Sequence, residues 1–167
     1  VDVELSLVVG AEVWSEAVIT VNVNRFDARG NIYYWTTSAS GIRKIPYGGQ
    51  AEDFLTAATT GYCVGCHSVR KDKIAYTFDG GNGPLGVRDL STGSDTIGHD
   101  SGVFGNFNTI SPDGSRVLVA FQGTLLLYDA VSGAFLYEVP TGGGATHPDW
   151  SPDGARVAVV LTNGDGG

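Results

Sequence analysis

A segment of eight residues occurs twice in the chain, and this repeat limits the possible folds more than any other feature of the sequence. Residues 110–117 read Ile-Ser-Pro-Asp-Gly-Ser-Arg-Val, and residues 150–157, which begin 40 positions later, read Trp-Ser-Pro-Asp-Gly-Ala-Arg-Val. The shared Ser-Pro-Asp-Gly suits a tight turn, because proline presets φ, aspartate bonds to the backbone locally and glycine accepts a positive φ. A fixed period of about 40 residues is typical of proteins built from stacked repeats.

The residues between the two copies predict short strands joined by hairpins. Runs at 117–121, 125–128 and 135–140 are rich in apolar residues, and Gly, Asp or Ser separates them. Four strands in roughly 40 residues make one blade of a β-propeller, so we expect an all-β chain of this class. The 25 glycines and a charged fraction of only 17% also fit short strands and tight turns better than long helices.

Weaker copies of the repeat lie earlier in the chain. Residues 67–74 align with 110–117 at a distance of 43 positions, and residues 89–93 align with 129–133. A further copy begins at Asp27, so we expect three blades and part of a fourth. The expected segments are residues 1–23, which form N-terminal strands that fit no blade, and blades at 24–62, 63–105, 106–145 and, incomplete, 146–167.

The pentapeptide Trp-Ser-Pro-Asp-Gly at 150–154 points to a known group of proteins. The repeats resemble the TolB-like, WD-type repeats of exported bacterial propellers, whose hallmark is this pentapeptide. The resemblance covers roughly residues 24–167 and implies a fold rather than a function. It implies that the chain is a portion of a larger ring of about six to eight blades, completed by further residues of a longer polypeptide or by partner chains.

Charge and hydropathy argue against a nucleic-acid partner, a transmembrane segment and a signal peptide. Ten Lys and Arg against 18 Asp and Glu give a formal net charge of −8. This charge would repel a phosphate backbone, so we expect no nucleic-acid partner. No run of 18 apolar residues exists, so we expect no transmembrane segment. The first ten residues have no basic leader, so we expect no signal peptide in this chain.

The main functional signal is the pentapeptide Cys63-Val64-Gly65-Cys66-His67. The pattern C-x-x-C-H is the attachment signal for c-type haem. In this chemistry, two thiols separated by two residues form thioethers with the haem vinyl groups, and the adjacent histidine coordinates iron. We therefore expect one covalent haem c, with thioethers at Cys63 and Cys66 and His67 as the proximal iron ligand.

Three other uses of the same residues stay open from the sequence. Cys63 and Cys66 could form a structural disulfide, with His67 beside them by coincidence. They could bind zinc together with His67 and a distant histidine, although adjacent Cys66 and His67 do not match the usual finger spacing. A thioredoxin-type redox pair would require a βαβ context that the sequence does not show.

The repeat alignment predicts where the haem motif lies. It puts His67 at the place of Ile110 and Trp150, so the motif replaces the first strand of its blade, which lines the central channel in propellers of this kind. The chain contains no Met, so His99 or His147 is the candidate distal ligand. His99 stands one blade away in a connecting loop, and His147 aligns with Val64.

These features favour a c-type cytochrome that transfers electrons outside the cytoplasm, in the bacterial periplasm or outside the cell. The acidic composition favours a basic redox protein as partner, and other cytochrome subunits are an alternative. A second hypothesis is a propeller without redox activity that binds a protein or peptide and has a Cys63–Cys66 disulfide. A third is a domain of a haem enzyme. We expect an electron carrier rather than a catalyst, and the sequence assigns no catalytic residue.

Overall fold

A computed structural model describes residues 2–3, 6–9, 12–15, 19–20 and 30–162. The chain divides into two compact units, Val1–Asn31 and Ile32–Gly167. In the first unit, β1 (Asp2–Val3) pairs with β4 (Ile19–Thr20), and β2 (Ser6–Val9) pairs with β3 (Glu12–Ser15). The sequence-predicted strands of residues 1–23 fall partly on these pairs and partly outside the described residues.

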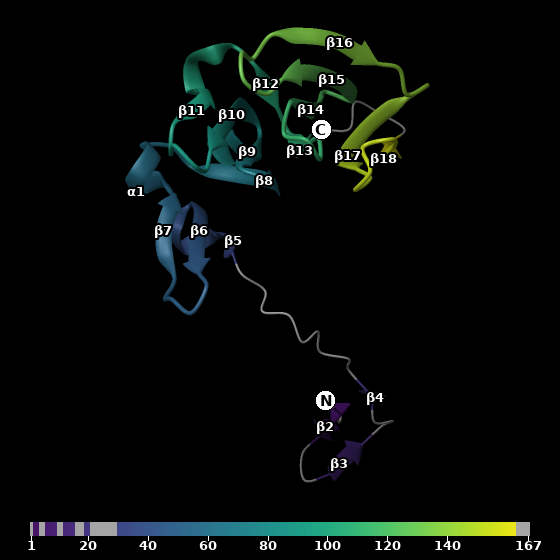
Figure 1. The fold of residues 1–167 in the computed structure, drawn as a ribbon. Helices are drawn as coiled ribbons and strands as arrows, with labels where there is room; N and C mark the ends of the chain where they lie inside the picture. The colour runs from purple at the N-terminus through teal and green to yellow at the C-terminus, as the bar shows by residue number, and fades with distance from the viewer. Residues whose placement is uncertain (1, 4–5, 10–11, 16–18, 21–29, 163–167) are drawn as a thin grey trace. The chain divides into compact units, whose positions relative to one another are not determined.

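The second unit is a series of antiparallel sheets in which each strand pairs with the next along the chain (Figure 1). The first sheet contains β5 (Asn31–Thr36), β6 (Gly41–Pro46) and β7 (Glu52–Leu55), and the second contains β8 (Val64–Arg70), β9 (Lys73–Phe78), β10 (Gly83–Asp89) and β11 (Asp95–Ile97). The third sheet contains β13 (Phe107–Ile110), β14 (Arg116–Phe121), β15 (Thr124–Asp129) and β16 (Phe135–Val139). The fourth contains β17 (Gly144–Trp150) and β18 (Val157–Thr162). A short strand, β12 (Phe104–Gly105), also pairs with β10. The predicted all-β fold is confirmed.

Helices are few and short in the described residues. They are α1 (Ala57–Thr60), η1 (Thr37–Ala39), η2 (Asp79–Gly81) and η3 (His99–Ser101), and each connects two strands. None of these helices is long and apolar enough to cross a membrane. The helix η2 lies in the connection between β9 and β10, which pair antiparallel.

Apolar side chains between successive sheets form three core clusters, one at each junction. Successive residues of β14 pack alternately into two of these clusters. Val117 and Val119 pack in the cluster shared with β9 and β10, whereas Leu118 and Ala120 pack with Ala145 of β17. Because neighbouring residues of a strand point to opposite faces, the second and third sheets are each covered on both sides by their neighbours. This face-to-face stacking is the arrangement of propeller blades.

The repeated Ser-Pro-Asp-Gly segments form tight hairpin turns, as predicted. The Ser111 hydroxyl accepts a hydrogen bond from the Arg116 amide at 3.0 Å, and Ser151 accepts the equivalent bond from Arg156 at 2.9 Å. Gly114 has a φ of +75°, a conformation that glycine adopts without steric cost. The repeated segment therefore sets the spacing between the first two strands of the third and fourth sheets.

The register of β8, which contains most of the segment 63–67, differs from the sequence alignment by two residues. Ile110 pairs with Val117, and Trp150 pairs with Val157, but the residue paired with Ile74 is Val69. The alignment of His67 with Ile110 was therefore wrong. The reason is the hairpin between β8 and β9, which is two residues shorter than the Ser-Pro-Asp-Gly turn and moves the whole first strand along its partner.

Candidate functional site

The pentapeptide 63–67 leads into β8, the first strand of the second sheet. This strand carries a bulge, because Gly65 pairs with Thr77 and Ser68 pairs with Ala75. Two residues of the motif, Cys66 and His67, thus stand opposite one residue of β9. Such bulges redirect side chains, and they are common beside functional sites.

Both cysteine sulfurs lie against the glycine pair of η2. A Cβ atom built on Gly81 would be 2.8 Å from the Sγ of Cys66, and one built on Gly80 would be 3.9 Å from the Sγ of Cys63. The glycines therefore leave the space that the thiols occupy. Both cysteines are free thiols and partly buried, and burial raises the pKa of the Cys66 thiol. The structure therefore contains no disulfide between them.

His67 is directed toward the preceding sheet, where its ring has a hydrogen bond with the backbone of Tyr33 in β5. Partial burial lowers the pKa of His67, an effect that the Tyr33 hydrogen bond partly opposes. The neutral imidazole is therefore favoured, which is the form that binds metals. Histidine ligands usually donate their other ring N–H to a carbonyl or carboxylate, so the contact with Tyr33 suits a ligand histidine.

A side chain from the next sheet spans the bulge. The Asn108 amide nitrogen donates to the Cys66 carbonyl at 2.6 Å, and its oxygen accepts from the Ser68 hydroxyl at 2.9 Å. Asn108 belongs to no motif of the sequence. Its only signal is its position near the start of the first strand of its blade, and a single buried amide there is common for structural reasons.

His99 in η3 lies close to the start of the motif. Its ring stacks on Tyr62, the residue before Cys63, with centroids 3.9 Å apart, and it meets the edge of Phe78 at 5.0 Å. Its Nδ1 atom is 2.8 Å from a carboxylate oxygen of Asp100. The loop position predicted for His99 therefore brings it beside the motif through Tyr62.

His147 occupies the same structural place on β17 as Cys66 on β8. The register of β17 shifts between Thr146 and Asp149, so this strand has an equivalent bulge. His147 has a φ of +47° and Cys66 has a φ of +38°. The sequence alignment of His147 with Val64 was therefore wrong by two residues. The His147 ring is exposed and stacks on Phe107 with centroids 3.6 Å apart.

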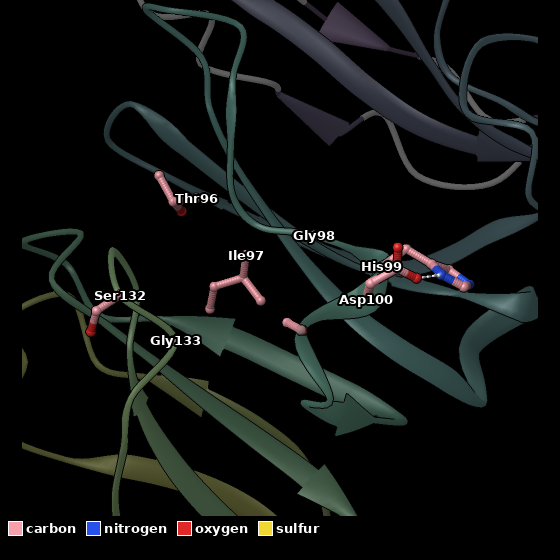
Figure 2. A pocket seen from close by; sticks show the side chains of 8 residues that line it. Thr96, Ile97, Gly98, His99, Asp100, Ser132 and Gly133 are labelled. Carbon is pink, nitrogen blue, oxygen red and sulfur yellow. Dashed lines mark hydrogen bonds and ion pairs between the residues drawn. The ribbon is translucent and has the colours of Figure 1, made fainter.

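A pocket of about 420 Å³ opens between the second and third sheets beside η3. Its lining consists of Thr96, Ile97, Gly98, His99, Asp100, Ser101, Ser132 and Gly133. Figure 2 shows the ring of His99 directed away from the side where Ser132 and Gly133 lie. The cysteines do not line this pocket, so it is separate from the thiols.

The described part of the chain contains no set of ligands for zinc. No three His, Cys, Asp or Glu side chains there lie close enough together to hold a metal ion. Cys66 faces Gly81 and His67 faces Tyr33, so the bulge separates the two groups that a zinc site would bring together. In contrast, haem attachment requires the thiols and the imidazole to reach different atoms of a large planar group.

Comparisons with known proteins identify the fold. No protein-family model and no curated protein matches the chain. Among solved structures, dihydro-heme d1 dehydrogenase NirN in complex with DHE matches with a TM-score of 0.58, 18% identity and 85% of this chain covered. Hsv2 from Kluyveromyces lactis matches with a TM-score of 0.57, 16% identity and 86% coverage. The fold is that of a partial β-propeller.

The chain spans only part of the length of these structures, namely 32% of NirN and 47% of the K. lactis Hsv2 chain. At identities below one fifth, the likeness concerns the fold and not the activity. The resemblance to TolB-like repeats stays a prediction about the closer family, while the propeller that it implied is confirmed.

Proposed function

We propose that this chain carries one covalently attached c-type haem and transfers electrons outside the cytoplasm. The observation that carries the proposal is the Cys-Val-Gly-Cys-His sequence at 63–67, whose two thiols are unjoined and lie together over Gly80 and Gly81. The hydrogen bond of His67 with Tyr33 and its lowered pKa also suit a ligand histidine.

The residues of the motif have separate roles in this proposal. Cys63 and Cys66 would hold the haem through thioether bonds to its two vinyl groups. His67 would supply a ring nitrogen to the iron, and the Tyr33 backbone would hold the ring in orientation. The bound haem would supply one-electron exchange between ferric and ferrous iron.

His99 and His147 are the two candidates for the distal position. His99 is connected to the motif by its stacking on Tyr62, and Asp100 can fix its tautomer. His147 stacks on Phe107, the residue next to Asn108, which in turn bonds to Cys66. Replacing each histidine by alanine tests the pair, because loss of a distal ligand changes the spectrum while the haem stays attached.

The proposed setting is the bacterial periplasm or the cell exterior, because c-type attachment is an extracytoplasmic chemistry. A net charge of −8 favours a basic redox protein as partner, with association that weakens as salt rises. NirN, whose solved structure is similar to this chain, is described as a dihydro-heme d1 dehydrogenase.

The test is production of the chain in a bacterium that attaches haem in its periplasm, followed by absorption spectroscopy and intact mass. We expect a c-type spectrum and one haem per chain in the parent, one thioether in Cys63→Ser and in Cys66→Ser, and none in the double variant. A colourless parent of unmodified mass would refute the proposal. A mass lower by two hydrogens would instead support the disulfide alternative, and carbon monoxide binding would support a haem enzyme.

A further inference from the structure

Asn108 is a buried polar residue that contacts the motif from another sheet. It lies on β13, the first strand of the third sheet, and its exposed fraction is 9%. Its amide nitrogen donates to the Cys66 carbonyl at 2.6 Å and lies 3.4 Å from the Thr77 hydroxyl, while its oxygen accepts from Ser68 at 2.9 Å. The amide therefore bonds to the residues on both sides of His67.

The place of these bonds gives them a specific effect on the backbone. Cys66 has a φ of +38°, a conformation that is unfavourable for an ordinary residue and persists only where its surroundings enforce it. Asn108 bonds to the carbonyl of this strained residue and to Ser68, where regular pairing with β9 resumes. One side chain thus fixes the two ends of the bulge.

The bulge of β17 offers a comparison within the same molecule. There, the neighbouring strand contributes Thr109, whose hydroxyl lies 3.5 Å from both the Asp149 carboxylate and the Trp150 amide. These contacts are long and leave the His147 carbonyl without a bond from that side chain. Thr109 lies on the sheet that precedes β17, whereas Asn108 lies on the sheet that follows β8, so the two side chains reach their bulges from opposite sides.

We infer that Asn108 is a positioning residue, which sets the directions of Cys66 and His67 by holding the bulge between them. With the amide in place, the Cys66 sulfur lies over Gly81 and the His67 ring lies toward Tyr33. Without it, Cys66 can relax to an extended conformation, which would move its sulfur away from Gly81 and rotate His67. The effect on haem rests on the proposed function, whereas the effect on the thiol does not.

The first test uses the unloaded protein and needs no haem. Alkylation of Cys63 and Cys66 by iodoacetamide is followed separately by peptide mass spectrometry in Asn108→Ala, Ser68→Ala and the double variant. We expect Asn108→Ala to raise the Cys66 rate relative to the Cys63 rate by about three- to tenfold, as loss of one or two hydrogen bonds implies. Ser68→Ala should give a smaller rise, and the double variant should match Asn108→Ala because both residues act on one bulge.

The control is Ser111→Ala in the turn after β13, which removes a buried hydroxyl that bonds to Asp113 and Arg116. General loosening of the third sheet would raise both rates together and leave their ratio unchanged. An unchanged ratio in folded Asn108→Ala, or an equal change in Ser111→Ala, would overturn the inference. If Asn108→Ala does not fold, Ser68→Ala gives the same decision.

The second test concerns haem. If the parent chain takes up haem, we expect Asn108→Ala to show fewer completed thioethers at Cys66 and an altered spectrum, and Ser111→Ala to match the parent in both. Normal attachment and an unchanged spectrum in Asn108→Ala would refute its role in haem positioning. If the parent takes up no haem, the proposed function fails, and the alkylation ratio still decides whether Asn108 orients Cys66.

Discussion

At the scale of single residues, positive φ angles and glycines, which have no side chain, together shape the candidate site. Cys66 is one of few non-glycine residues with positive φ in the described chain, and its sulfur occupies space that Gly81 leaves open. Gly81 itself has a φ of +107°, which disfavours any side chain there. The position of the thiol thus depends on a residue 15 positions away in the next connection.

Gly81→Ala should displace the Cys66 sulfur. The added Cβ would lie 2.8 Å from this atom, so that one of the two must move. We expect a loss of stability of more than about 1 kcal/mol, together with faster alkylation of Cys66. Denaturant unfolding and iodoacetamide labelling measure the two effects.

The matched control for this substitution is Gly93→Ala. Gly93 also has a positive φ of +74°, but a Cβ built on it meets no atom within 4 Å. It should therefore lose stability through backbone strain alone and leave the Cys66 rate unchanged. Equal labelling of Cys66 in both variants would show that the contact with Gly81 does not control the thiol.

Sequence reasoning could identify the residues of the site whose chemistry is itself the signal. Cys63, Cys66 and His67 are recognisable because thiols and imidazole at that spacing have few other uses. It could not identify Asn108 or Gly81, because an amide and a glycine are common in strands and turns. Their importance arises only from contacts across sheets, and local spacing carries no information about those contacts.

At the scale of elements, hairpin length decides which residues stand side by side. The turn between β13 and β14 contains the full Ser-Pro-Asp-Gly segment, whereas the turn between β8 and β9 is two residues shorter. The alignment by sequence assumed equal turns, so it misplaced His67 and His147 by two positions. The second strands were aligned correctly, because Ile74 and Val117 are both fully buried and begin equivalent ladders.

The Ser-Pro-Asp-Gly hairpin should make stability depend on acid pH. Hydrogen bonds from the hydroxyl of Ser111 and from Ser115 lower the pKa of Asp113 to about 2. Because this folded value lies below the unfolded value of about 3.9, the charge stabilises the fold above pH 4, and the contribution is lost as the pH falls toward 2. The effect should be small, since the carboxylate is solvated.

Asp113→Asn tests this dependence. The variant keeps an acceptor oxygen but has no charge to titrate, so its unfolding midpoint should fall less steeply than that of the parent between pH 4 and pH 2. Asp153→Asn is the partner experiment, because hydrogen bonds from Ser151 and Ala155 likewise lower the pKa of Asp153. Parallel pH profiles for parent and Asp113→Asn would contradict the assignment.

At the scale of the whole molecule, the period of the repeat predicted the architecture better than any single strand. One turn motif repeated after 40 residues was enough to indicate blades, and the propeller neighbours confirm this class of fold. The fourth sheet has only two strands among the described residues, whereas the second and third each have a complete set. The side chains that further strands would cover are consequently exposed on β16 and β18.

These exposed strands should make the chain associate as salt rises. Val160 and Leu161 of β18 are 53% and 63% exposed, and β18 pairs only with β17 in the described chain. Uncovered apolar edges favour association. The net charge of −8 opposes it. Raising ionic strength from about 0.01 to 0.15 M shortens the screening length from about 30 to 8 Å, so light scattering should increase.

Leu161→Lys should suppress this association, because it adds a charge to the open edge without changing a buried contact. Val131→Lys is the matched control, since Val131 is 58% exposed but lies in a turn and not on a strand edge. Equal suppression by both variants would mean that net charge alone governs association. Suppression by Leu161→Lys only would show that the uncovered strand drives it, because the two variants change the net charge identically and differ only in where the charge stands.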